Sequence, residues 1–431
     1  PYLPAGRRLL CIMPWNRGWH AIQYRQKRRH STDYITQKGT MHSCPVCLAS
    51  SSRVFFEMRD VPASEGYLAS ARSEAAQCDL VDIVLRFCES CGHIWNEAYD
   101  PEKLPFNPQY DISMYHSASY RAYVDGAIER LKARYDIAGK AALDIACGKG
   151  EFLRALIAHG FEHAYGFDQA FDESCLSEND RKRITAHQAF YDESYRSLKV
   201  ALVTCRSAMQ FFTKPRLFLE SIHRTLADQP ETVLCFEVPN AEEIFARQSV
   251  WPVTYDYPCF FSPASLSRLF RESGFDVLDI LPALGGSHLE IEAKRSVKPA
   301  PSRFESRASI DANSAHVDSF SRVREARVSD WTDRLAREPA AGRTVALWGA
   351  GARALSFLCS IPDLYSIQYA IDVNPARQRR YLPKVGLPVV APEKLKSLPV
   401  DLVIATNPNF AEEIRGQLAA LDVECEFDIL D

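Results

Sequence analysis

Four cysteines near the start of the chain have the spacing of metal ligands. Cys44 and Cys47 form one C-x-x-C pair, and Cys88 and Cys91 form a second pair after a long intervening segment. Each pair places two sulfur atoms on one tight turn, and four thiolates suit a tetrahedral zinc ion. Because four protein ligands leave no open coordination position, we expect a structural Zn²⁺ ion. Two separate turns with free or redox-active thiols are the alternative.

A glycine-rich turn follows in the stretch AALDIACGKGEFLRALIAHG, which begins at Ala141. Its apolar run predicts a strand, and its repeating apolar positions predict a helix that ends near Gly160. Small residues let the turn approach a ligand, and the helix N-terminus offers free amides. Leu153 does not fit the third glycine of the dinucleotide pattern G-x-G-x-x-G. The acidic residue and the Cys-Gly-x-Gly turn instead resemble motif I of class I methyltransferases, which bind S-adenosylmethionine (SAM). That resemblance assigns cofactor contacts to Asp144, Ala146, Cys147, Gly148 and Gly150.

Three later strand ends complete the expected cofactor site. Asp168 ends the strand HAYGFD, where a carboxylate can accept hydrogen bonds from both ribose hydroxyls. Ligands of open α/β sheets gather at such carboxyl ends. In the alternative interpretation, Asp168 is a solvated loop acid and the glycine turn is a structural corner. The strand ITAHQAF offers Gln188, Ala189 and Phe190 to the adenine, and ALVTCRSAMQFF brings Cys205 to Gln210 to the methyl-donor edge.

Two other stretches carry side chains that can move protons. Tyr115, His116 and Ser117 precede the amphipathic stretch YVDGAIERLKARY, which predicts a helix. A cluster of this kind usually serves capping and packing. The aromatic loop WPVTYDYPCFFSP contains Asp256 and Tyr257 and is either a substrate wall or core packing.

Near the C-terminus, WGAGARALSFL predicts a second strand, turn and helix. Gly349, Gly351 and Ala354 fit a relaxed G-x-G-x-x-A pattern, and the next strand ends at Asp372. This signal is weak by itself, and a true NAD site and a purely structural domain are both alternatives to a domain that helps to hold a substrate.

The order of these motifs resembles that of the sugar C-methyltransferase family. The two cysteine pairs, the Tyr-His-Ser cluster, LDIACGKG, FEVPNAE, FFSPASLSRLF, GGSHLEIEA and the C-terminal IDVNPARQRRYLP all follow its pattern. The resemblance covers nearly everything after Met41. It implies an N-terminal zinc module, a Rossmann-like class I methyltransferase core and a C-terminal Rossmann-like α/β domain. It further implies a small-molecule acceptor, a nucleotide-linked keto-deoxysugar, whose nucleotide portion the last domain helps to hold.

The same resemblance implies how the methyl acceptor is activated. A carbon next to a ketone becomes nucleophilic only after a base removes its proton. The family pattern carries a tyrosine role onto Tyr115. Where relatives often have an acidic residue and a histidine, this chain has Asp256 and Tyr257, so the expected imidazole is absent. His116 and His288 are the candidates to replace this imidazole, although either is more often a structural histidine. The candidate catalytic residues are Tyr115, His116, Asp256 and Tyr257.

Asn-Pro-Asn at 407–409 is a further departure from the family pattern. The motifs also divide the chain into segments. We expect Arg-rich residues 1–40 to be a basic tail or a non-native extension that precedes a natural start at Met41. The remaining expected boundaries are 41–105 for the zinc module, 106–295 for the methyltransferase domain, 296–340 for a linker and 341–431 for the C-terminal domain.

The composition excludes several other functions. A net charge of −4 over 431 residues gives no general attraction for nucleic acid. No apolar run reaches membrane-spanning length, so we expect a cytoplasmic protein whose thirteen cysteines are mostly buried thiols. A small-molecule O-methyltransferase, an NAD-dependent sugar oxidoreductase and a non-catalytic binding protein are the alternative functions. The oligomeric state stays open.

Overall fold

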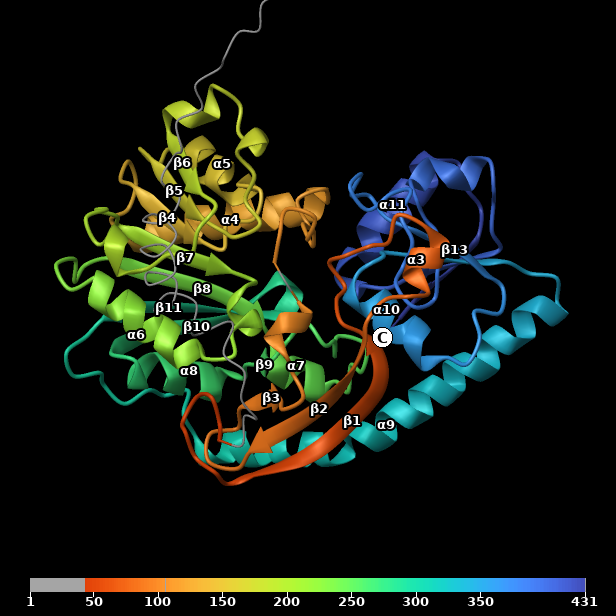
Figure 1. Cartoon of the computed structure of the whole chain (residues 1–431), viewed down its shortest axis with the longest axis horizontal. Coiled ribbons are helices and arrows are strands. Elements are labelled where there is room, and N and C mark those ends of the chain that lie inside the picture. The colour runs from red at the N-terminus through yellow and green to blue at the C-terminus, as the bar shows by residue number, and fades with distance from the viewer. Residues whose placement is uncertain (1–42, 105, 431) are drawn as a thin grey trace, which may run out of the picture.

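The computed structural model describes residues 43–104 and 106–430, so the expectations for residues 1–40 and Met41 lie outside the described residues (Figure 1). The described chain forms three β-sheets. The first, in the order β1-β2-β3-β9, is built on a long antiparallel hairpin. Its strands are β1 (Ser52–Pro62), β2 (Leu80–Cys88), β3 (Ile94–Asn96) and β9 (Cys259–Phe260), with helix α3 (Arg72–Ala75) in the hairpin connection.

The central sheet has the order β10-β11-β8-β7-β4-β5-β6. The strands from β4 to β8 are parallel, while β11 is antiparallel to both of its neighbours. Every residue of β8, with the sequence VLCFEVP, is buried, as expected for a strand that is covered on both faces. The strands are β4 (Ala142–Ile145), β5 (Ala164–Phe167), β6 (Ile184–His187), β7 (Leu202–Arg206), β8 (Val233–Pro239), β10 (Phe275–Ala283) and β11 (His288–Arg295).

Helices cover both faces of this sheet, and their ends follow local chemistry. Ser117 caps α4 by accepting a hydrogen bond from the Tyr120 amide, and Ser262 and Ser265 form a capping box on α8. Gly274, with a φ of +92°, follows the end of α8. These helices are α4 (Ala118–Arg134), α5 (Glu151–Ala158), α6 (Pro215–Thr225), α7 (Ala241–Ala246) and α8 (Pro263–Glu272).

The third sheet is parallel throughout, in the order β14-β13-β12-β15-β16. The parallel strands β4 to β8 of the central sheet, together with this third sheet, confirm the α/β, Rossmann-like fold class predicted from the sequence. The elements of this part are β12 (Val345–Trp348), α10 (Ala352–Ser360), β13 (Ile367–Ile371), β14 (Val389–Val390), β15 (Leu402–Ala405), α11 (Ala411–Ala420) and β16 (Glu426–Ile429).

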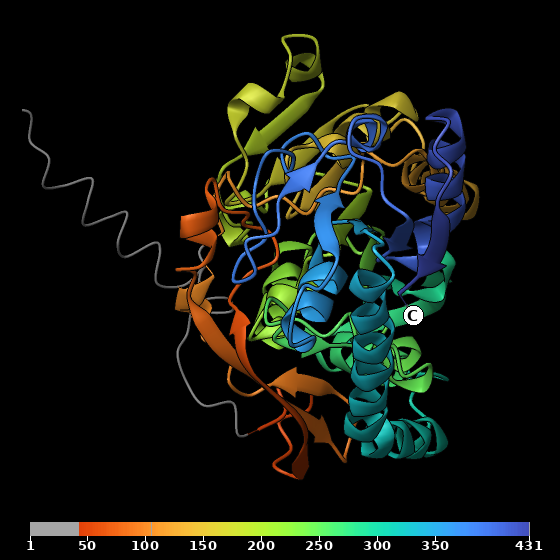
Figure 2. The ribbon, with the colours of Figure 1, turned by 90° about the vertical axis from the view of Figure 1, so that its right-hand side faces the viewer.

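The long helix α9 (Arg307–Ala340) joins the central and C-terminal sheets (Figures 1 and 2). It packs against β1 and α7. The Phe320 ring makes edge-to-face contacts with Phe56 and Phe245, with ring centroids 5.3 Å and 4.8 Å apart. The segment expected as a linker therefore carries a helix whose apolar side binds the N-terminal sheet to the central domain.

Short 3₁₀ helices fill the connections. They are η1 (Pro101–Lys103), η2 (Glu173–Cys175), η3 (Asp180–Lys182), η4 (Glu193–Tyr195), η5 (Met209–Phe211), η6 (Leu284–Gly286), η7 (Pro392–Lys396) and η8 (Pro408–Phe410). No helix in the described ranges is both long and apolar enough to cross a bilayer.

Candidate active site

A cavity of about 1010 Å³ lies between the carboxyl edge of the central sheet and the C-terminal sheet. The turn after β4 and the ends of β5 and β7 line one side of it, and the turn after β12 lines the other. The segment between η1 and α4 supplies a further wall. Because carboxyl ends of parallel strands collect ligands, both Rossmann-like sheets direct their binding edges into the same space.

The turn after β4 has the backbone shape that a nucleotide cofactor needs. Ala146, Gly148 and Gly150 all have positive φ angles, of +61°, +54° and +78°. A Cβ atom built on Gly148 would meet no protein atom within 4 Å, so this face of the turn is open. The Gly148 amide donates to the Asp168 carboxylate at 2.8 Å, and the Ala170 amide donates to its other oxygen at 2.6 Å. The turn and the acidic strand end are thereby fixed together, and they fit SAM.

Two aspartates lie beneath this turn in different environments. Asp144 is 2% exposed and accepts a 2.6 Å hydrogen bond from the Thr204 hydroxyl. Burial raises the pKa of Asp144 to about 7. Burial also raises the pKa of Asp168, and the amides of Ala170 and Gly148 oppose that rise. Both side chains line the cavity.

Most of the residues predicted to bind the cofactor surround this space, and three do not reach it. Gln188 is exposed and donates to the Gln169 carbonyl, Cys205 is fully buried inside the sheet, and Gly150 caps α5 behind the turn. The residues that line the cavity are Asp144, Ala146, Cys147, Gly148, Asp168, Ala189, Phe190 and Gln210.

The candidate catalytic residues occupy different positions. Tyr115 and His116 both line the cavity, and the Tyr115 hydroxyl is buried with no hydrogen-bond partner among the described residues. Burial raises the pKa of Tyr115, which favours the neutral phenol. Tyr257 also lines the cavity, whereas Asp256 is 1% exposed and lies behind it.

His288 lines the cavity beside a buried ion pair. The Arg206 guanidinium contacts the Glu237 carboxylate at 2.9 Å, and both side chains are almost fully buried. The Ser287 hydroxyl lies 3.0 Å from His288 Nδ1 and accepts a hydrogen bond from the Asn409 side chain at 2.8 Å. Burial lowers the pKa of His288, so its imidazole is held neutral.

Glu65 and Arg353 are among the charged cavity residues that the sequence did not single out, whereas Arg206 falls inside the predicted stretch from Cys205 to Gln210. Arg206 follows Cys205 on β7, and side chains alternate along a strand, so the neighbour of the predicted residue faces the ligand. Arg353 lies in the first turn of α10, where a cation opposes the helix dipole, and that was an available signal. Glu65 gave no signal, because it lies in a loop far from every motif in sequence.

Contacts between domains close the cavity on two sides. Lys149 of the cofactor turn pairs with Asp111, which accepts a 2.9 Å hydrogen bond from the Asn374 side chain. Glu413 of α11 caps α4 by accepting hydrogen bonds from the amides of Ala118 and Ser119 at 3.0 Å and 3.1 Å. The C-terminal domain therefore contacts α4 directly through Glu413 and is linked to the cofactor turn through Asp111.

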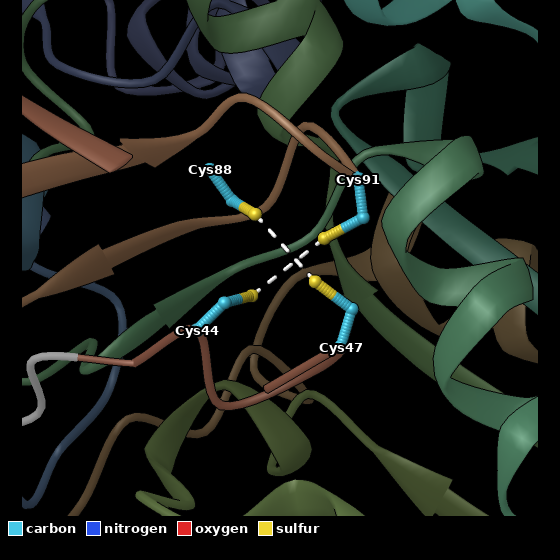
Figure 3. A group of neighbouring side chains, drawn as sticks. All are labelled: Cys44, Cys47, Cys88 and Cys91. Carbon is cyan, nitrogen blue, oxygen red and sulfur yellow. Dashed lines mark hydrogen bonds between the residues drawn. The ribbon is translucent and has the colours of Figure 1, made fainter. Parts of the chain in front are cut away.

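The four predicted metal ligands converge on one centre (Figure 3). Their sulfur atoms all lie within 4.8 Å of one another. The Cys44 and Cys91 sulfurs are 3.6 Å apart, as are those of Cys47 and Cys88. Zinc–sulfur bonds of about 2.3 Å give sulfur separations of about 3.8 Å in a tetrahedron. The cluster has the donor set and the size of a four-cysteine zinc site.

Comparison with known proteins assigns both α/β domains. Residues 117–280 match a methyltransferase domain, and residues 290–427 match a C-methyltransferase C-terminal domain. No curated protein matches the chain.

Solved structures similar to this chain include three methyltransferases. One is an S-adenosylmethionine-dependent methyltransferase from Clostridium acetobutylicum, with 14% identity, a TM-score of 0.33, and coverage of 43% of this chain and 96% of that one. A second, from Mesorhizobium loti, has 18% identity, a TM-score of 0.31, and coverage of 40% and 100%. A third is magnesium protoporphyrin IX methyltransferase from Synechocystis with bound SAH, with 16% identity, a TM-score of 0.31, and coverage of 41% and 84%.

The two matched domain families follow one another along this chain and cover its central and C-terminal sheets. The open glycine turn with its paired aspartate supplies the cofactor site that the first of them requires. The chain belongs to the C-methyltransferase family of class I S-adenosylmethionine-dependent methyltransferases.

Proposed function

We propose that this methyltransferase transfers the methyl group of SAM to a carbon beside the ketone of a nucleotide-linked keto-sugar. The observation that carries the proposal is the large cavity, which extends from the cofactor turn at Gly148 to the C-terminal turn at Gly351. Its volume of about 1010 Å³ is at the upper end of ligand pockets, roughly 300–1,000 Å³, and leaves room for an acceptor beside the cofactor.

Arg353 supports an anionic acceptor. Its guanidinium lines the cavity and donates to the Ser249 hydroxyl at 3.3 Å, and it has no carboxylate partner within residues 43–104 and 106–430. Burial lowers the pKa of Arg353 to about 10. A partly buried cation without a counter-charge is unfavourable, and a diphosphate would supply the missing charge with bidentate geometry.

The cofactor supplies an electrophilic methyl group, and the protein positions the acceptor. In the proposed arrangement, Asp168 accepts hydrogen bonds from the ribose, and Tyr115 offers its unpaired hydroxyl to the acceptor. Removal of a proton beside the ketone leaves the electron pair on an enolate, whose carbon forms the new bond to the methyl group. The sulfur–methyl bond breaks with its electrons remaining on sulfur, and most of the acceleration comes from holding the two partners at near-attack distance.

A labelled-methyl experiment tests this function. The enzyme, isotopically labelled SAM and a nucleotide-linked keto-deoxysugar are incubated together, and NMR locates the label in the product. We expect a methyl group on carbon, and little product from the same sugar without its nucleotide. A label on oxygen would instead identify an O-methyltransferase, and no transfer to any keto-sugar would remove the proposed acceptor class.

We also propose that the four-cysteine cluster holds a structural zinc ion. Elemental analysis should find one zinc per chain in the wild type and none in Cys88→Ser. Because metal binding is coupled to folding, Cys88→Ser should also lower the melting temperature strongly. The control Cys78→Ser changes a cysteine outside the cluster and should keep the zinc. A zinc-free wild-type protein of unchanged stability would favour free thiols.

The expected boundaries 41–105, 106–295 and 341–431 stay our proposal for the domains. We also propose a cytoplasmic location. No two described cysteines are joined in a disulfide, which suits a reducing compartment.

A further inference from the structure

Two buried carboxyl groups lie together at the edge of the cavity that faces the C-terminal turn. Glu65, in the loop after β1, is 5% exposed and lines the cavity, and Asp256 is 1% exposed and lies behind it. Neither group belongs to the cofactor turn. The Glu65 loop comes from the N-terminal sheet, so three parts of the chain meet here.

The hydrogen bonds divide the roles within this pair. Asp256 accepts from the Ser64 hydroxyl at 3.2 Å, the Glu65 amide at 3.1 Å and the Tyr110 hydroxyl at 3.2 Å. The Tyr257 hydroxyl and the Ala352 amide face the Glu65 carboxyl group and act to lower its pKa. With more donors and a position away from the ligand space, Asp256 is the better holder of negative charge. Two neighbouring carboxylates resist double ionisation, so the exchangeable proton belongs on Glu65.

The charges around Glu65 support this division. Burial and the Asp256 charge raise the pKa of Glu65 to about 8, while Arg377 opposes the rise. Arg377 donates to the Glu65 carbonyl at 3.0 Å, and Tyr110 is the other titratable neighbour. Burial raises the pKa of Tyr257 well above its usual value, so it stays a hydroxyl donor. Arg353 faces Tyr257 from the C-terminal domain. A base whose pKa lies near the working pH is effective in proton transfer.

We propose that Glu65 is the catalytic base that removes the acceptor's carbon-bound proton, in the place of the histidine that Tyr257 replaces. This inference rests on the proposed function. The Glu65 carboxylate takes the proton from the carbon beside the ketone, and the C–H electron pair forms the enolate. The enolate carbon then bonds to the methyl group as the sulfur–methyl bond breaks, and the protonated Glu65 later loses its proton to solvent. Tyr257 and Asp256 are positioning residues, which orient Glu65 and set its proton affinity.

Hydrogen exchange separates deprotonation from methyl transfer. The enzyme, S-adenosylhomocysteine and a nucleotide-linked keto-deoxysugar are incubated in D₂O, and mass spectrometry follows deuterium uptake beside the ketone. Glu65→Gln keeps the shape of the side chain and should slow this exchange by about 10²–10⁴-fold, the range of general base catalysis. S-adenosylhomocysteine binding and the melting temperature should not change. The matched control Glu57→Gln, an exposed carboxylate on the strand β1 that leads into the Glu65 loop, should exchange at the wild-type rate.

Two further variants identify the role more closely. Glu65→Asp should recover part of the exchange, and Asp256→Asn should shift the midpoint of the pH–rate profile to lower pH, because a negative neighbour is removed. Exchange in Glu65→Gln within a few-fold of wild type, in an enzyme that methylates the sugar, would overturn the inference but not the proposed function.

A measurement without substrate tests the role of Glu65 independently of the proposed acceptor class. Infrared difference spectra of the full chain should show carboxyl groups with raised pKa values in the wild type and in Glu57→Gln, among them Asp144 near pH 7 and Glu65 near pH 8, and only the group near pH 8 should be absent in Glu65→Gln. If no group titrates near pH 8, or if that group survives in Glu65→Gln, Glu65 is not the base, whatever the substrate.

Discussion

The cofactor turn after β4 and the C-terminal turn after β12 share one backbone design but carry opposite charges. The amides of Ala146 and Gly349 each donate to the last residue of the neighbouring strand at 2.7 Å. In both turns, the following aspartate accepts from a turn amide, Gly148 to Asp168 at 2.8 Å and Ala350 to Asp372 at 3.1 Å.

The side chains within this shared backbone differ. The cofactor turn has the buried Asp144 two residues before Ala146, where the C-terminal turn has Leu347 before Gly349. The C-terminal turn instead carries Arg353, in the position that Gly150 occupies relative to the first turn. The fold thus supplies an open nucleotide-type turn twice, and single side chains adapt one copy to SAM and the other to an anion.

The largest effect should come from Asp144, which Leu347 replaces in the second turn. Its pKa rises from 3.8 to about 7 in the folded protein, which corresponds to about 4 kcal/mol. Protonated Asp144 makes its full contribution to the free energy of unfolding below pH ~3.9, and this contribution is lost as pH rises through about 7. Asp144→Asn should therefore reduce the decline in stability between these values and be more stable than wild type above pH 7. Denaturant titrations across this range check it, and an unchanged pH dependence would contradict it.

Replacing Asp168 or Asp372 by alanine tests which of the two turns holds SAM. Asp168→Ala should weaken S-adenosylhomocysteine binding about 100-fold, because charged hydrogen bonds contribute about 1.5–3 kcal/mol each. Asp372→Ala, the matched change in the C-terminal turn, should leave this affinity within two-fold. Calorimetric titration measures both, with NAD as a second ligand. Binding of NAD in place of S-adenosylhomocysteine would reverse the assignment of the turns.

Replacing Arg353 tests whether the C-terminal turn binds an anionic acceptor. Arg353→Ala should raise the KM for a nucleotide-linked acceptor about 10-fold or more, since a guanidinium–phosphate contact is lost. S-adenosylhomocysteine affinity should not change. The exposed Arg380→Ala is the control for the loss of one positive charge. Equal KM values in both variants would mean that Arg353 does not contact the acceptor.

The smallest effects should come from the first residue of each turn. Ala146 has a φ of +61°, which costs an L-residue about 1–2 kcal/mol, so Ala146→Gly should increase stability by about 1 kcal/mol. Gly349 has a φ of +105°, and a Cβ there would lie 2.4 Å from the Thr406 hydroxyl oxygen, so Gly349→Ala should be destabilising. Thermal unfolding gives both values. Similar stability changes of the same sign would show that the turns do not differ in this way.

Local sequence determined the parts of this protein whose chemistry lies within a few residues. The glycine turn and the helix after it follow from residue size and hydrophobic period. The spacing of the two cysteine pairs likewise predicted that they form one cluster, since four thiols at this spacing have few other uses.

Only the tertiary structure decided which distant groups share the cavity. Glu65, Tyr257 and Ala352 belong to three separate parts of the chain, and no periodicity relates them. Gln188 and Cys205 lie on the expected strand ends, but the direction of each side chain depends on strand register, where a shift of one residue reverses the face. Sequence therefore determined the cofactor turn, because that turn is a short-range backbone structure. The acceptor site required the fold, because it consists of side chains brought together by domain packing.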